Sequence, residues 1–155
     1  MRIELLADRP ELLPTLAEWH HAEWGYLHPG STLEDRIGWL RPEVQRGAIP
    51  FCVVAVDDGG RALGSASIVE HDMDVHLDWT PWLASVFVHP DHRRRGIGAA
   101  LVRRATAEAR ALGVTELYLF TPDQARFYER LGWRELLQEE YRGTDVTIMT
   151  ISLAR

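Results

Sequence analysis

The chain has 155 residues, of which 46% are hydrophobic and 26% are charged, and its formal net charge is -6. These are ordinary globular values, and the length predicts one domain over residues 1–155. The acidic balance argues against a nucleic-acid partner, because neutralising phosphates needs a broad basic face. No signal-peptide core begins the chain and no apolar run is long enough to span a bilayer, so a membrane partner is not expected.

The sequence contains a single cysteine, Cys52, within the run FCVVAV. A lone cysteine forms no internal disulfide, so a cytoplasmic location fits best. A thiol in an apolar strand is far more often part of the core than a nucleophile, and we assign Cys52 to the core.

The first third of the chain is predicted as one short strand and two helices. Helix starts are indicated where an acidic or hydroxyl residue precedes a glutamate by three positions, and stops where glycine or proline interrupts the apolar spacing. The strand is predicted over residues 2–6. The first helix would start at the pair Asp8 and Glu11 and stop at Gly25. The second helix would start at the pair Ser31 and Glu34 and break at Pro42.

The remainder alternates between strands and helices. Two β-rich runs joined by turn residues predict a hairpin, and a longer helix has one apolar face. The order predicts a mixed α/β fold with antiparallel strands first and a strand–helix–strand unit in the middle. The elements are strands 51–56, 63–69, 82–88, 114–120, 133–138 and 144–153, and helices 96–112 and 124–130.

A local basic cluster stands out on this acidic chain, in the segment HPDHRRRGIGAALVRRA from His89 to Ala105. The first N–H groups of a helix have no intrahelical partner and carry partial positive charge. Gly96 and Gly98 let an anion approach the backbone closely. A phosphate or pyrophosphate site is therefore predicted; the alternative is a solvated helix entry after an ordinary turn. The pattern lacks the lysine of a P-loop and the third glycine of a dinucleotide fold.

The segment from Arg93 to Gly98 resembles the coenzyme A loop, R-x-x-G-x-G, of the GNAT superfamily of acyl-CoA-dependent N-acyltransferases. The segment ARFYERLGW, residues 125–133, resembles a second motif of that superfamily. The element order is similar along essentially the whole chain. The resemblance implies a central, mixed, mostly antiparallel sheet of about seven strands flanked by about four helices. Strands 82–88 and 114–120 would splay apart to form a coenzyme A wedge.

The resemblance also implies which residues bind acetyl-CoA as co-substrate. No metal is expected, because the spacing of His71, His76 and the aspartates around them matches no standard zinc or EF-hand pattern. Main-chain groups of strand 82–88 would pair with the pantetheine arm, and the glycine loop would hold the pyrophosphate. Thr121 stands where many relatives carry an asparagine, so its contact departs from the family pattern. The implied set is Val86, Phe87, Val88, Arg93, Arg94, Arg95, Gly96, Ile97, Gly98, Ala99, Thr121, Gln124, Phe127 and Tyr128.

Acetyl transfer to an amine needs a base for the amine, a donor to the carbonyl oxygen and an acid for the leaving thiolate. The resemblance places Tyr128 beside the sulfur as the acid, and a main-chain N–H near Val86 as the oxygen donor. Strand 82–88 has no carboxylate, so we predict Asp72 or Glu70 as the base, acting through water. The alternative is that both belong to a solvated acidic loop.

The predicted acceptor is a primary amine. Carboxylates interspersed with aromatic side chains suit a small cationic amine, through charge pairing and cation–π contact. Trp24, Tyr26, Asp72 and Trp82 are the predicted acceptor-binding residues. Two alternatives stay open: a protein or peptide N-terminal acetyltransferase, and a non-catalytic acyl-CoA-binding domain. The sequence also leaves open whether the chain forms a homodimer.

Overall fold

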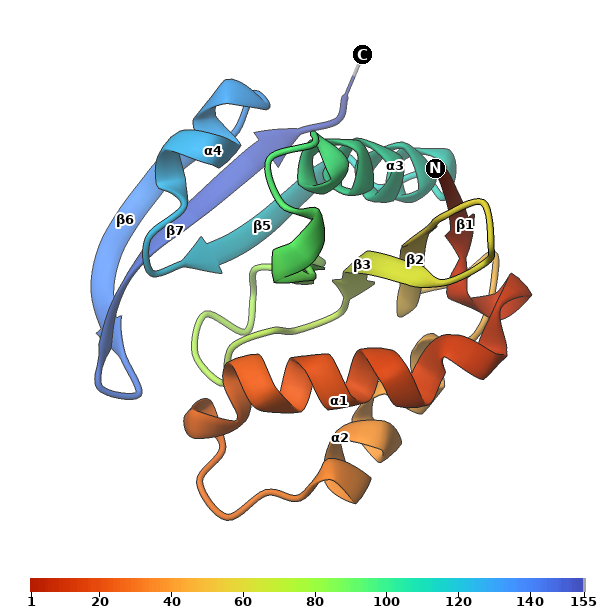
Figure 1. The fold of residues 1–155 in the computed structure, drawn as a ribbon. Coiled ribbons are helices and arrows are strands. Elements are labelled where there is room, and N and C mark those ends of the chain that lie inside the picture. The colour runs from red at the N-terminus through yellow and green to blue at the C-terminus, as the bar shows by residue number, and fades with distance from the viewer. Residues whose placement is uncertain (155) are drawn as a thin grey trace.

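A computed structural model describes residues 1–154, whose secondary structure is a seven-stranded sheet with helices on both faces (Figure 1). The sheet order is β1-β2-β3-β4-β5-β7-β6, and all neighbours are antiparallel except β4 and β5. The strands are β1 (Arg2–Leu5), β2 (Phe51–Val56), β3 (Ala62–Val69), β4 (Trp82–Val88), β5 (Glu116–Thr121), β6 (Arg134–Tyr141) and β7 (Thr144–Ser152). The α-helices are α1 (Leu13–Trp24), α2 (Leu33–Leu40), α3 (Ile97–Ala111) and α4 (Ala125–Arg130). None of these helices is long and apolar enough to cross a membrane.

The predicted mixed α/β fold is confirmed, but two helix starts were predicted wrongly. Two short 3₁₀ segments precede α1, which begins at Leu13 without a side-chain cap. Asp8 forms an ion pair with Arg46 in place of a capping box. The second capping box lies one residue later than predicted and joins Thr32 to Asp35, with N–O distances of 3.0 and 3.1 Å.

Alternating side chains of β2 show how the layers form. Phe51, Val53 and Ala55 belong to the core beneath α3 and α4. Cys52 and Val54 face the opposite way and pack in the cluster that α1 and α2 cover. This strand is buried on both faces, which explains its continuous apolar sequence.

The two halves of the sheet meet where β4 runs parallel to β5. Only one pair of residues, Trp82 and Tyr118, is aligned between these strands. Beyond this pair the strands diverge toward their carboxyl ends, as the predicted wedge requires. In Figure 1, β5, β6 and β7 form one wing, while β1, β2 and β3 form the other.

Candidate active site

A cavity of about 810 Å³ opens where β4 and β5 separate. Residues 83–88 of β4 line one side, and residues 119–124, which end β5 and lead into α4, line the other. The first turn of α3 closes one end, and the segment after α1 together with Arg36 of α2 contributes to the wall elsewhere. One continuous space therefore joins the glycine loop to the acidic and aromatic residues near α1.

The amino end of α3 presents free amides to this cavity. The first intrahelical bond runs from the Ala100 N–H to the Gly96 carbonyl at 3.1 Å, which leaves the earlier N–H groups of the helix without intrahelical partners. Gly96 has a φ of +76°, a left-handed conformation that glycine adopts without strain. A Cβ on Gly98 would make ordinary contact with Phe127 at 3.5 Å, whereas nothing lies within 4 Å of a Cβ placed on Gly96, so the surface beside Gly96 is open. The arrangement suits an anion bound against the backbone.

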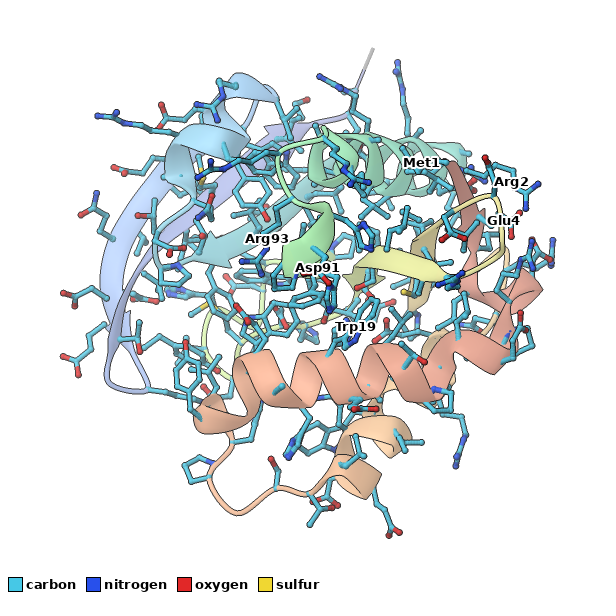
Figure 2. The ribbon with its side chains drawn as sticks, in the orientation of Figure 1. Met1, Arg2, Glu4, Trp19, Asp91 and Arg93 are labelled. Carbon is cyan, nitrogen blue, oxygen red and sulfur yellow. The ribbon has the colours of Figure 1, made fainter. Side chains whose placement is uncertain are left out.

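The three consecutive arginines before α3 have different surroundings. Arg93 donates through Nε to the Val88 carbonyl at 2.9 Å and lies 5.8 Å over the Phe87 ring, so it also holds the end of β4 in place. Arg94 is exposed in the cavity wall. Arg95 does not line this cavity and contacts His92 at 3.5 Å. Figure 2 labels Arg93 and Asp91 on the segment between β4 and α3, which faces α1.

A β-bulge shapes the cavity side of β4. Ser65 of β3 pairs with Phe87 and Ser67 pairs with Ala84, so one residue of β3 faces two residues of β4. The first bulged residue, Ser85, has a φ of +54°, which is uncommon outside glycine. A bulge re-aims the strand that carries it, and both bulged residues line the cavity.

A buried hydrogen-bond chain ties this bulge to α1. The Ser65 hydroxyl donates to the Ser85 carbonyl at 3.0 Å, and the His20 Nε2 lies 2.8 Å from the same hydroxyl. Ser65 has one proton and gives it to Ser85, so His20 must donate through Nε2. Burial, and to a lesser extent the charge of Arg36, lowers the pKa of His20 to about 3. The neutral Nε2–H tautomer therefore persists at physiological pH.

Tyr128 lies on α4 and lines the cavity with its side chain 8% exposed. Its ring packs at a steep angle against Phe127 and Trp133, with centroid distances of 5.0 and 6.1 Å. Burial, with the charges of Asp72 and Asp123, raises the pKa of Tyr128 well above its usual value. The hydroxyl therefore stays protonated at working pH and is able to donate a proton.

The structure separates the two carboxylates that were predicted as bases. Asp72 is half-buried in the cavity wall, and its burial raises its pKa to about 7, although Arg36 opposes this shift. Glu70 is exposed, does not line the cavity and accepts a hydrogen bond from the Thr80 hydroxyl at 3.3 Å. A carboxylate that titrates near neutrality can take up and release a proton at working pH, and Asp72 has this property.

Only some of the predicted acceptor-binding residues lie together in the cavity wall. Glu23, Trp24, Tyr26 and Asp72 line the cavity. Trp82 does not: it is 1% exposed, and its indole N–H donates to the Trp79 carbonyl at 2.7 Å. An indole buried in this way packs the sheet and cannot contact an acceptor, so we leave Trp82 out of the proposed site, together with Glu70 and Arg95.

Thr121 is buried at the end of β5 and lines the cavity. Its hydroxyl accepts a hydrogen bond from the Gln124 N–H at 3.0 Å. The residue thus organises the turn into α4, and its remaining hydroxyl proton can still face a ligand.

Sequence reasoning missed a buried polar group around α2. Glu43 is 8% exposed, accepts a hydrogen bond from Ser67 at 2.5 Å, and has a pKa raised by burial to about 8. Arg36 lies in the cavity wall, and the charges of Arg36 and Glu43 influence each other. The two residues lie outside both sequence motifs. The mixed polar residues on this helix did not indicate that Arg36 and Glu43 are close to each other in the fold.

Known proteins share both this sequence pattern and this fold. Residues 49–135 match the family model of the acetyltransferase (GNAT) domain. Mycothiol acetyltransferase of Mycolicibacterium gilvum is 44% identical over 59 residues, which are 36% of this chain and 18% of that protein. The chain thus spans less than a fifth of the length of the curated relatives that it matches.

Two solved structures superpose over the whole chain. One is yncA of Salmonella typhimurium with acetyl-CoA, at 23% identity, a TM-score of 0.71 and coverage of 100% of this chain and 95% of that one. The other is an aminoglycoside 6'-N-acetyltransferase with coenzyme A, at 18% identity, a TM-score of 0.78 and coverage of 100% and 98%. The fold and the family match together define an acetyltransferase (GNAT) domain. The chain belongs to the GNAT acetyltransferase family.

The buried histidine makes a testable contribution to stability. The unfolded chain protonates His20 below about pH 6.5, whereas the folded chain keeps it neutral down to about pH 3. The unfolded state therefore binds more protons as the pH falls, and this contribution to stability is lost with acidification. Between pH 6.5 and 5, wild type should lose about 2 kcal/mol of unfolding free energy relative to His20→Gln, at about 1.4 kcal/mol per pH unit.

Urea titrations at each pH measure this difference. Both proteins retain Asp72 and Glu43, whose raised pKa values act in the opposite direction, so their contributions cancel. The glutamine amide keeps a donor for Ser65. A constant difference between the two proteins across this pH range would contradict a buried neutral His20.

Proposed function

We propose that this chain transfers the acetyl group of acetyl-CoA to the primary amine of a small acceptor that is cationic when free, by direct attack in a ternary complex. The observation that carries the proposal is the single cavity that joins the free amides of α3, the bulged edge of β4, Tyr128 and Asp72. Acetyl-CoA and coenzyme A in the two solved relatives support the choice of donor. We also propose that residues 1–155 act as one domain, as the continuous sheet suggests, and that the chain acts in the cytoplasm.

The residues around the wedge fit coenzyme A. The amides of Ile97, Gly98 and Ala99 would bind the pyrophosphate, with Arg93 and Arg94 adding charge. The open surface at Gly96 supports this assignment, because nothing lies within 4 Å of the position that a Cβ would take there. Main-chain groups from Val86 to Val88 would pair with the pantetheine, although the Val88 carbonyl already accepts from Arg93. When bound, the donor supplies an activated thioester.

The proposed chemistry divides between the two sides of the cavity. Asp72 takes a proton from the acceptor ammonium, directly or through water, so that the amine nitrogen can bond to the acetyl carbon. A main-chain N–H near Val86 stabilises the carbonyl oxygen as it gains negative charge. As the carbon–sulfur bond breaks, Tyr128 gives its proton to the sulfur, and the second proton that the nitrogen loses on becoming an amide restores the Tyr128 hydroxyl through water. No side-chain nucleophile is required.

Two alternatives predict different behaviour in one assay. A non-catalytic acyl-CoA-binding domain would bind acetyl-CoA and release no thiol with any amine. A peptide N-terminal acetyltransferase would release thiol with peptides and prefer them to small amines. A panel of amines and peptides, scored by free thiol, tests the proposal: release with small amines supports it, and release with peptides alone contradicts it.

The pyrophosphate assignment predicts that Gly98→Asp weakens acetyl-CoA binding about tenfold or more, because it places a negative charge beside the phosphates. Gly98→Ala adds only a Cβ in ordinary contact distance and should have a smaller effect. Calorimetric titration of both folded variants measures the affinities. If Gly98→Asp binds acetyl-CoA as tightly as wild type does, the pyrophosphate lies elsewhere.

The acid assignment predicts that Tyr128→Phe lowers kcat by about 10²- to 10⁴-fold and leaves the donor Kd nearly unchanged, because only the hydroxyl is removed. Tyr118→Phe is the matched control, since the Tyr118 hydroxyl lies 3.3 Å from Glu116 and does not line the cavity. Steady-state kinetics and donor titration separate the two effects. A kcat within about twofold of wild type would make Tyr128 a packing residue.

The base assignment predicts a pH dependence. Asp72 is active as the carboxylate, so kcat/KM should rise with pH through about 7, the pKa to which burial raises this group. Asp72→Asn should lower kcat and remove this limb, leaving only the rise due to ionisation of the amine. Glu70→Gln should keep the wild-type profile. The reverse result, with the limb lost in Glu70→Gln and kept in Asp72→Asn, would transfer the role to Glu70.

A further inference from the structure

The guanidinium of Arg36 is the unusual cation of the cavity wall. Its Nε and Nη2 atoms are buried without a hydrogen-bond partner, and no ion pair within 4.0 Å involves it among residues 1–154. The guanidinium carbon lies 5.2 Å from the centre of the Trp39 ring. Burial of a charged donor without a partner costs free energy, which a bound anion would recover.

The groups that face Arg36 do not neutralise it. Asp72 and Glu43 are close enough to affect its pKa, yet burial lowers the pKa of Arg36 overall. Both carboxyl groups have raised pKa values, about 7 and 8, so neither is fully ionised at neutral pH. His20 and His28 also face Arg36, and their pKa values are lowered, which keeps them neutral.

A second arginine in the same wall provides a comparison. Arg142 donates to the Leu27 carbonyl at 2.9 Å, contacts His28 at 3.2 Å, and donates to Asp74 at 3.1 Å. These bonds join the turn between β6 and β7 to the segments that follow α1 and β3. Arg142 therefore has protein partners for its charge, whereas Arg36 keeps its donors for a ligand.

We propose that the acceptor is an amino carboxylate, with its carboxylate bound by Arg36 and its amine next to Asp72. This inference rests on the proposed function and adds a second charge to the acceptor. Guanidinium binds a carboxylate through paired hydrogen bonds. A monoanion fits better than a phosphate dianion, because the Glu23 carboxylate also lies in this wall and repels additional negative charge. Amino acids are the substrate class that carries both groups.

The test compares each of the common amino acids with its own carboxamide, which keeps the amine and the side chain and removes the negative charge. Thiol release measures acetylation, and calorimetry in the presence of coenzyme A measures binding. Wild type should prefer the acid about tenfold or more in kcat/KM. Arg36→Gln should lower kcat/KM for the acid by about 10- to 100-fold and change that for the carboxamide less than about threefold.

Two further variants serve as controls. Arg41→Gln removes an exposed charge that follows α2 and does not line the cavity, so its preference should match wild type. Arg36→Lys keeps the charge but not the paired donors and should show an intermediate loss. Thermal unfolding of each variant shows whether the fold is retained, and the acid-to-carboxamide ratio is measured within one protein, so a general loss of activity does not alter it.

The outcomes distinguish this inference from the proposed function. Amines acetylated without preference for the acid, or an equal loss for acid and carboxamide in Arg36→Gln, would overturn the carboxylate assignment and leave the acetyltransferase intact. Binding of acids that depends on Arg36, without acetylation of any amine, would support the carboxylate site and overturn the proposed function. Failure to bind or acetylate any acid would overturn the carboxylate assignment.

Discussion

The divergence of β4 from β5 is the constraint on which the cavity depends. After the pair Trp82 and Tyr118, no cross-strand alignment holds the two halves of the sheet together. Elsewhere in a sheet an unpaired edge is a liability, but here the edge of β4 lines a deep cavity. The large core beneath α3 and α4 spans both halves and keeps them in one body.

The bulge at Ser85 gives this edge its particular shape, and its conformation needs support because a φ of +54° is unfavourable for serine. Support comes from residues distant in sequence: His20 on α1 and Ser65 on β3 form the chain that ends at the Ser85 carbonyl. Aromatic packing reinforces it, since the ring of His20 lies 6.4 Å from that of Phe87. The layer of α1 therefore contributes both to the core and to the geometry of the cavity.

Burial raises the pKa of a group on each side of the proposed reaction. The same loss of solvent that keeps Tyr128 protonated also brings Asp72 to a pKa near neutrality. In water an aspartate would be too weak a base to hold a proton at pH 7. A shared cavity can thus hold an acid that retains its proton and a base that exchanges one, although both belong to the same partly dehydrated space.

Local sequence determined the parts of this protein whose chemistry lies in one short segment. The turn at Gly96, the free amides of α3 and the aromatic pair on α4 follow from adjacent residues and from the helix itself. The order of strands and helices was also readable, because apolar periodicity reports it directly. The helix starts were harder to predict from the sequence. Asp8 forms an ion pair with Arg46 instead of capping a helix, and the residues next to Asp8 do not reveal this contact.

Tertiary structure decided everything that depends on burial and on contacts between distant segments. It separated Asp72 from Glu70, although both lie in the same short acidic stretch, because only one of them faces the cavity. It placed Trp82 in the core and His20 beneath the bulge. It also left the Nε and Nη2 atoms of Arg36 buried without a hydrogen-bond partner. Desolvation and long-range packing determine the charge state and accessibility of a side chain, and neither is a property of its neighbours in sequence.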